Sequence, residues 1–516
     1  MYRRSLLFPR RRRKPRKAGV RAPDRLTNLP LLPRLKILSS LPIDEAVRTG
    51  VLSRRWRNLW KYMDDITVTY PSKKLWKCFD DLELDGYESE EATDEWVYQN
   101  MKAAGNMLRQ LRNRHIKKLT LHCEHDPPVE FAYQWVKFAF SRKVKVLVLK
   151  FLGINYSAPD WFGKNSSLED MSVRGCFFFE IDGEVRWTLL KRLSLRFLRI
   201  SDGEMSKILD GCPLLEDLIL RNVNNLKTLS VACPSVKNLM IMNENSDIET
   251  DLNEITAPWV QSLKIDEVLT ENALQLKSLS SLRKAHINIV YKGKNDNFDW
   301  FVKRGSEVLE GVVLIEQLSL RGDIVKFLSV MKIWKIPCGF LLSLTHLTLG
   351  VYGCLHEVPG IMYVLQHAPC LKTLIFKTGY LQVWSPSEWE DQVCRWAIST
   401  IKDRVAYMKD QILNLGCLKN IKILHAGCSH RQTAGRLAFD VAIYILKHVT
   451  ALEEFVLALP ENDNPCCMQC LAGSNNVCGY LESLNQKLYN QLGDRFKSDE
   501  WEASIAGSCL RIVSRR

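Results

Sequence analysis

One short pattern recurs along most of this chain: an apolar residue, two variable residues, and then apolar residues at alternate positions. Copies occur at 115–123, 144–150, 167–174, 190–195, 214–221, 226–231, 236–241, 260–265, 282–287, 315–320, 344–349 and 371–376. The alternating part of each copy has the period of two that predicts a short strand with one buried face. With Leu119, Leu147, Met171, Leu193 and Leu218 taken as equivalent, the copies lie 28, 24, 22 and 25 residues apart. This spacing fits leucine-rich repeats, whose period is about 20–29 residues.

A single copy cannot bury its apolar face alone, so the copies are expected to stack into one continuous core with a curved parallel sheet. Helix-like segments such as 203–213 separate some of the strands. Between residues 218 and 239, however, successive strand patterns are only about ten residues apart, which leaves no room for a helix. The sequence therefore predicts an irregular solenoid over residues 115–380.

The region after the repeats has a different rhythm. Residues 381–416 favour helix and interrupt the repeats, and residues 417–424, 436–449 and 451–457 then read as strand, amphipathic helix and strand. We expect this unit, within residues 417–460, to cover the exposed edge of the sheet. Residues 461–516 are predicted to be a C-terminal tail.

The segment before the repeats reads as three short helices within residues 24–65. Leu35, Leu38 and Leu41 share one helical face, and Pro42 ends that helix. Asp44 can cap a second helix and Ser53 a third.

These helices carry more apolar side chains than about 40 residues can bury by themselves. Val47, Val51 and Leu52 belong to the second helix, and Trp56 and Trp60 lie four residues apart on the third. Either the unit packs on the rest of the chain, or it offers an apolar face to another protein.

The same segment resembles the F-box family, and more narrowly the plant F-box proteins with leucine-rich repeats and a C-terminal FBD region. The matching stretches are 24–26, 29–30, 37–39, 41–42, 46–49 and 51–60. The resemblance implies docking onto the small linker subunit of an SCF (cullin-RING) ubiquitin ligase, and it identifies 417–460 as an FBD-like cap. The predicted partner-binding and F-box core residues are Leu29, Pro30, Leu35, Ile37, Leu38, Leu41, Val47, Val51, Leu52, Trp56 and Trp60.

Four residues depart from the F-box pattern. Leu31 and Leu32 stand where the family usually has an acidic pair, and Pro33 and Arg34 stand where it usually has two apolar residues. Pro33 fits a helix only within its first turn, and Arg34 removes an apolar contact. These departures leave open how strongly the linker subunit would be bound.

Charge is concentrated at the start of the chain. The formal net charge is +14, but residues 1–25 hold eleven Lys or Arg and one acid, so the other 491 residues carry only +4. Residues 1–23 are predicted to be a disordered basic tail, and residues 66–114 an acidic linker followed by a helix. The tail reads as a nuclear-import signal, with weak nucleic-acid binding, a solvated tail or an organellar transit peptide as alternatives. The import residues would be Arg10, Arg11, Arg12, Arg13, Lys14, Arg16 and Lys17.

No motif of a catalytic or metal site stands out. The cysteines between Cys466 and Cys478 include one pair with zinc-ligand spacing but no nearby histidine, so we predict reduced thiols and no metal. Scattered cysteines such as Cys123 and Cys233 indicate mostly buried free thiols in a reducing compartment. The chain also has no phosphate-binding glycine loop, HExxH pair or GxSxG elbow, and no apolar run of membrane-spanning length.

The sequence therefore predicts an α/β chain: a three-helix F-box, an irregular leucine-rich-repeat solenoid and an FBD-like cap. We expect a non-catalytic substrate adaptor without a cofactor, bound to the linker subunit and cullin through the F-box and to a target protein through the repeats. Its location is expected to be nuclear, with the cytoplasm left open. The alternative is a nuclear scaffold outside any ligase, or a nucleic-acid-associated repeat protein, whose F-box is degenerate.

Overall fold

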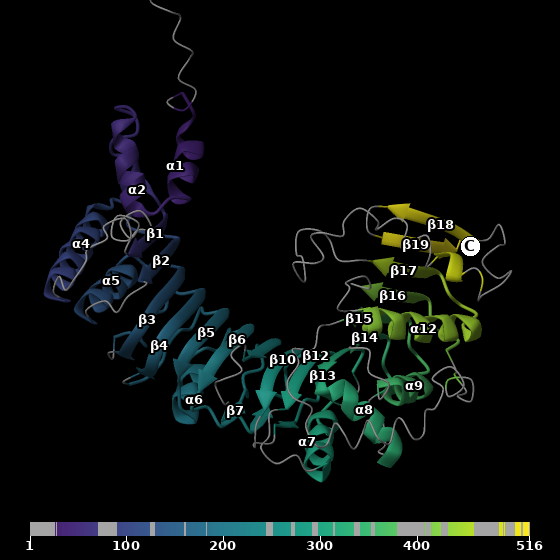
Figure 1. The fold of residues 1–516 in the computed structure, drawn as a ribbon. Helices are drawn as coiled ribbons and strands as arrows, with labels where there is room; N and C mark the ends of the chain where they lie inside the picture. Colours follow the sequence, from purple (N-terminus) through teal and green to yellow (C-terminus); the bar gives the residue numbers. More distant parts are fainter. Residues whose placement is uncertain are drawn as a thin grey trace, which may run out of the picture.

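The computed structural model is an arc of stacked strands with two short helices at its N-terminal end (Figure 1). The residues that it describes are 26, 28–70, 90–123, 129–158, 161–181, 183–243, 251–269, 274–291, 298–312, 315–334, 341–351, 357–378, 408, 413, 415–424, 432–458, 485–488, 490, 501–506 and 509–514.

One sheet runs through the whole arc. In spatial order its strands are β1 (Asp65–Tyr70), β2 (Lys118–Cys123), β3 (Val146–Ala158), β4 (Asp170–Ile181), β5 (Arg192–Arg199), β6 (Asp217–Asn224), β8 (Asn238–Met242), β10 (Ser262–Leu269), β12 (Lys284–Tyr291), β13 (Gln317–Gly322), β14 (His346–Val351), β15 (Thr373–Thr378), β16 (Asn420–Leu424), β17 (Glu454–Ala458), β19 (Cys509–Ser514) and β18 (Trp501–Ala506). The strands from β1 to β17 pair in parallel, whereas β17, β19 and β18 pair antiparallel.

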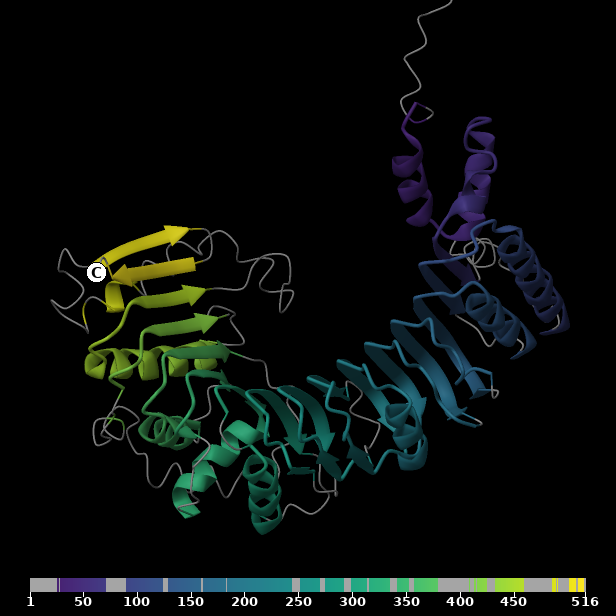
Figure 2. The ribbon, with the colours of Figure 1, turned by 180° about the vertical axis from the view of Figure 1, so that it is seen from behind.

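The helices of the repeats lie along the outer side of the arc, seen from both directions (Figures 1 and 2). They are α4 (Glu90–Gln110), α5 (Val129–Ser141), α6 (Asp202–Asp210), α7 (Phe298–Glu310), α8 (Asp323–Trp334), α9 (Glu357–His367) and α12 (Gln432–His448). A helix is about 10 Å wide, whereas neighbouring strands lie about 4.8 Å apart, so the helix side of the stack is the longer one and the sheet curves.

The apolar position of each repeat lies in register with that of the next strand. Leu119 pairs with Leu147, Leu147 with Met171, and Met171 with Leu193, which in turn pairs with Leu218. All five side chains are fully buried. The predicted equivalence of these positions is confirmed, and with it the leucine-rich-repeat solenoid.

The closely spaced strand patterns at 218–239 belong to two different sheets. Strand β7 (Thr228–Ser230) does not belong to the large sheet. It pairs with β9 (Glu254–Thr256), and β9 pairs in turn with β11 (Gln275–Lys277), so the three form a second sheet. The chain therefore crosses the core between β6 and β8 with a strand instead of a helix. This second sheet explains the irregular spacing that the sequence showed.

The sheet extends further at both ends than the repeats suggested. Its first strand, β1, lies directly after the F-box and not at residue 115, because an isolated six-residue strand shows no repeat of its own. At the other end, residues 501–514 are not tail: β18 and β19 pair antiparallel on β17 and cover the edge that the predicted strand–helix–strand unit leaves open. Most of the predicted helical insert 381–416 lies outside the described residues.

The F-box contains two α-helices, α1 (Leu31–Ser39) and α2 (Ile43–Arg48), followed by 3₁₀ helices at Thr49–Val51 and Leu59–Tyr62. The third predicted helix is replaced by turns over residues 54–58. Ser53 O accepts from both Trp56 N (3.0 Å) and Arg57 N (3.2 Å), and Trp56 O accepts from Leu59 N (3.1 Å), so three- and four-residue turns mix and no regular helix forms. Side-chain spacing alone cannot distinguish these turns from an α-helix over so few residues. Asp44 lies within the first turn of α2 and makes no cap bond; Pro42 occupies the cap position.

Two helical glycines provide a test of the packing between layers. A Cβ on Gly305 of α7 would come within 2.3 Å of the Phe327 ring of α8, whereas a Cβ on Gly203 of α6 would meet nothing within 4 Å. Gly203→Ala should therefore raise the free energy of unfolding by up to about 1 kcal/mol through helix propensity. Gly305→Ala should lower it by about 1–3 kcal/mol through overpacking. Urea denaturation of both variants measures the difference, and shifts in the same direction would contradict the close contact of α7 and α8.

Candidate protein-interaction surfaces

The predicted F-box residues divide into an inner and an outer set. Leu38, Trp56 and Trp60 are buried, with exposed fractions of 0%, 1% and 5%. Leu35, Leu41 and Val47 are partly buried against the same core. That core is continuous with the core of the repeats, so these side chains serve as packing residues and are not available to a partner.

The outer set consists of large apolar side chains that the fold leaves in solvent. Val51 is 88% exposed, Leu52 56% and Ile37 37%. Two residues absent from the predicted set, Leu31 and Leu32, are 53% and 77% exposed. The sequence offered one sign that these residues are exposed: they stand where the family usually has an acidic pair, and leucine at such a position adds apolar surface. Of the remaining predicted residues, Pro30 is exposed and Leu29 is half-buried.

The departures at Pro33 and Arg34 are accommodated locally. Pro33 lies in the first turn of α1, where its missing N–H costs no helical bond. The guanidinium of Arg34 donates from Nη1 to the carbonyl oxygen of Arg55 over 3.1 Å. Arg34 thus replaces an apolar contact with a hydrogen bond that holds α1 against the turn carrying Trp56.

Backbone hydrogen bonds fasten the F-box to the first repeat. The N–H groups of Arg112 and Lys117 donate to the carbonyl oxygens of Lys61 (2.8 Å) and Asp64 (2.7 Å). The side-chain amide of Asn113 adds to these bonds, since its Nδ2 donates to the carbonyl oxygens of Tyr62 and Met63, at 2.7 and 3.0 Å. The F-box therefore has a fixed orientation relative to the sheet.

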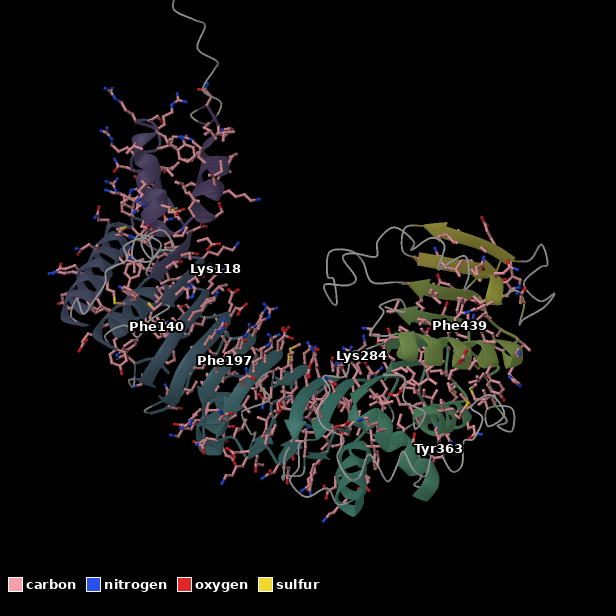
Figure 3. The ribbon with its side chains drawn as sticks, in the orientation of Figure 1. Lys118, Phe140, Phe197, Lys284, Tyr363 and Phe439 are labelled. Carbon is pink, nitrogen blue, oxygen red and sulfur yellow. The ribbon has the colours of Figure 1, made fainter. Side chains whose placement is uncertain are left out.

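The second surface is the inner face of the arc. Along each strand the residues that alternate with the buried ones face away from the helices, as in Lys118, Thr120 and His122 of β2. Lys118 near the F-box and Lys284 near the middle both lie on this inner side, whereas Phe140 and Tyr363 lie on the helix side (Figure 3). No described helix covers this inner face, which we call the open face.

The open face is rich in positive charge. On each strand from β1 to β17 of the large sheet, the first, third and fifth residues lie on this face and form its first, second and third rows. Together these positions carry eleven lysines and arginines and five carboxylates. The cations are Lys118, Lys150, Arg174, Arg192, Arg196, Arg221, Lys264, Lys284, Arg321, Lys377 and Lys422, and the carboxylates are Asp65, Asp170, Asp217, Asp266 and Glu454. Since the chain outside residues 1–25 is nearly neutral, this face is more basic than the folded body as a whole.

Four of the five carboxylates are already engaged. Arg192 lies between Asp170 and Asp217, at 2.9 and 3.2 Å. Asp266 accepts from the amide of Asn288 over 2.7 Å. Lys422 contacts Glu454 at 2.8 Å and lowers the pKa of that carboxyl.

The positive face also affects a histidine near its centre. Burial, assisted by Lys264 and Arg321, lowers the pKa of His286 to about 4 against an opposing effect of Asp266. Its Nδ1 shares a hydrogen bond with Ser319 Oγ over 2.8 Å. His286 is therefore neutral at physiological pH.

Backbone strain lies beside the arginines of β4 to β6. The residue that directly follows each of Arg174, Arg196 and Arg221 has a positive φ: Gly175 (88°), Phe197 (54°) and Asn222 (49°). Glycine and asparagine tolerate this left-handed region, but for a bulky residue such as Phe197 it costs about 1–2 kcal/mol. The Phe197 ring is 38% exposed and lies beneath the Arg174 guanidinium, whose central carbon is 5.1 Å from the ring centroid.

Two predicted features fall outside the part of the chain that the structure describes. The basic tail and the cysteines from Cys466 to Cys478 lie outside the described residues. Within those residues, no group of His, Cys, Asp or Glu is suited to hold a metal, and no helix has the length and apolarity to cross a bilayer. The six described free cysteines include two buried ones, Cys123 and Cys212, so the expectation of mostly buried thiols is not met there.

Trp56 is buried and Val51 is exposed, which predicts a large loss of stability on truncation of Trp56 and a small change on truncation of Val51. Trp56→Ala should lower the free energy of unfolding by about 3–5 kcal/mol, because it opens a cavity in the shared core. Val51→Ala should change it by less than about 0.5 kcal/mol. Thermal melting and denaturant titration of the full chain measure both, and a Trp56→Ala protein as stable as wild type would contradict the inner position.

The depressed pKa of His286 predicts a stability change with pH. The unfolded chain protonates this imidazole near its ordinary pKa of 6.5, whereas the folded chain resists protonation until about pH 4. The stability that depends on neutral His286 is therefore fully present above pH 6.5 and is lost as the pH falls from 6.5 to 4. His286→Asn removes the titrating group, so denaturant unfolding at several pH values should show a smaller acid-induced loss. Parallel pH curves for variant and wild type would refute the shift.

Both the repeats and the F-box segment match known protein families. Residues 107–484 match the family described as "At1g61320/AtMIF1, LRR domain", and residues 26–66 match the F-box domain. Among relatives from Arabidopsis thaliana, "Putative F-box/LRR-repeat protein At3g18150" is 28% identical over 363 residues, which is 69% of this chain and 72% of the relative. "F-box/LRR-repeat protein At3g03360" is 28% identical over 66% of this chain and 67% of its own length. "F-box/FBD/LRR-repeat protein At3g52680" is 30% identical over 48% of this chain and 52% of its own length.

These matches confirm the predicted family, while the assignment of 417–460 as an FBD region stays a prediction. Because the matched repeat family alone spans about three quarters of the sequence, and an F-box precedes it, this chain belongs to the F-box/leucine-rich-repeat proteins.

Proposed function

We propose that this protein is the substrate-recognition adaptor of an SCF ubiquitin ligase. The F-box would bind the linker subunit and through it the cullin, and the repeats would hold a target protein for ubiquitination. The observation that carries the proposal is the outer set of the F-box, which is apolar and solvent-exposed on a unit whose own core is already complete. Exposed apolar side chains of this kind are typical of a protein-binding surface.

The arrangement of the two surfaces supports the same function. The F-box stands at one end of the arc and the open face lines its inner side (Figures 1 and 2). Because hydrogen bonds fasten the F-box to the first repeat, a target on the open face would be held in a defined position relative to the ligase. Catalysis would then come from the raised effective concentration of target lysines near the transferring enzyme. No residue of this chain needs to act as a nucleophile or base.

The outer set can be tested without unfolding the protein. Val51→Asp/Leu52→Asp places charge where apolar side chains would be buried, and each burial contributes about 1.5–3 kcal/mol. We expect the affinity for the linker subunit to fall at least about 100-fold, measured by titration calorimetry, with matching loss of linker and cullin on affinity purification. Leu342→Asp is the matched control, since Leu342 is 62% exposed but lies in the repeats.

Equal recovery of the linker subunit by wild type and the double variant, or recovery by neither, would contradict the adaptor function. The alternative is a scaffold or nucleic-acid-associated protein whose F-box has lost its partner, which the missing acidic pair at Leu31 and Leu32 favours. In that case nucleic-acid binding should strengthen steeply as salt is lowered and should disappear on deletion of residues 1–23.

A further inference from the structure

Four cations occupy one row of the open face, meaning positions that pair with one another across neighbouring strands. Lys150 of β3, Arg174 of β4, Arg196 of β5 and Arg221 of β6 are joined by consecutive strand pairing. Neighbouring strands lie about 4.8 Å apart, so this cationic ladder spans about 14 Å. No aspartate or glutamate occupies the same row on any strand from β1 to β8.

We infer that the cationic ladder binds an acidic segment of a protein partner, laid across strands β3 to β6. The inference rests on the proposed function and names the chemistry of the target that the repeats would recognise. A span of about 14 Å corresponds to about four or five extended residues, enough for two or three carboxylates on one side of the segment. Arginine presents a planar fork of donors that fits a carboxylate with two parallel hydrogen bonds.

The charges of the face favour an anion at this place. Like charges directly opposite one another on neighbouring strands destabilise a sheet, and an acidic ligand would offset that repulsion. The nearby carboxylates Asp170 and Asp217 are held by Arg192 in the first row, so they are engaged away from the ladder.

The backbone beside the ladder adopts a strained, left-handed conformation. The left-handed residues Gly175, Phe197 and Asn222 follow the three arginines on adjacent strands, and such bulge-like irregularities re-aim side chains. At Phe197 the strain also exposes an aromatic ring beneath Arg174. Strain of this kind is concentrated at binding sites in proteins.

A protein segment fits the surroundings better than nucleic acid. Over strands β3 to β6 the row beside the ladder carries Val148, Ser172, Ser194 and Ile219, and the two apolar side chains at its ends suit apolar residues of a peptide. Single-stranded nucleic acids are bound on several stacking aromatics, whereas among the described side chains the ring that contacts the ladder is Phe197, which Arg174 covers.

The test uses the full chain and a fluorescein-labelled octapeptide of alternating glutamate and valine, with its glutamine counterpart as the neutral probe. Fluorescence anisotropy should show the glutamate peptide bound at least about tenfold more tightly than the glutamine peptide, with an affinity that falls as salt is raised. The double reversal Lys150→Glu/Arg174→Glu should weaken the binding at least about tenfold. Lys137→Glu/Lys207→Glu is the matched control, because it changes the charge equally on the outer helices α5 and α6 and should leave the binding unchanged.

Failure of this inference can be separated from failure of the proposed function. The ladder variant should still bind the linker subunit, and Val51→Asp/Leu52→Asp should still bind the glutamate peptide. Equal binding of the two peptides, or wild-type binding by the ladder variant, would overturn the inference. So would tighter binding of a labelled oligothymidylate than of the glutamate peptide, provided that the ladder variant loses it, which would identify the ladder and not the basic tail as a nucleic-acid site.

Discussion

The structure depends on one repeated contact: an apolar side chain of each strand packs, in register, beside its counterpart on the next strand. Leu119, Leu147, Met171, Leu193 and Leu218 form the start of this row, which continues through the later repeats. Each strand has only its neighbours as partners, so the row must be continuous for any repeat to be stable. Where a helix does not fit between strands, as between β6 and β8, a second small sheet of β7, β9 and β11 supplies the missing packing.

The F-box is stabilised by the same core. Trp56, Trp60 and Leu38 are buried in a cluster that continues into the repeats, which removes them from contact with any partner. This burial completes the core of the unit without Ile37, Val51 and Leu52, which are left in solvent. A resemblance at the level of sequence combined both kinds of residue into one predicted site, and burial separates them.

The open face has a different physical character from the core beneath it. Its carboxylates are largely engaged with neighbouring cations or amides, and the register of the strands places Lys150, Arg174, Arg196 and Arg221 side by side. The left-handed φ of Phe197 adds a local energetic cost at the same place. Charge repulsion and strain together favour the acidic ligand that we propose for this part of the sheet.

The sequence by itself determined the period of the repeats, the parallel sheet and the F-box, because each follows from local spacing of apolar residues and a short, specific motif. It also located the irregular spacing at 218–239, though not its cause, since pairing between β7 and β9 joins residues about 26 apart. The common row of Lys150, Arg174, Arg196 and Arg221 also follows from the sequence, since each cation lies three residues after one of the equivalent apolar positions. Only the tertiary structure decided that β1 and the β18–β19 pair belong to the sheet and that the 54–58 segment is a set of turns. These features depend on which segments meet in space, and segments outside the repeat pattern carry no periodic signal that identifies their neighbours.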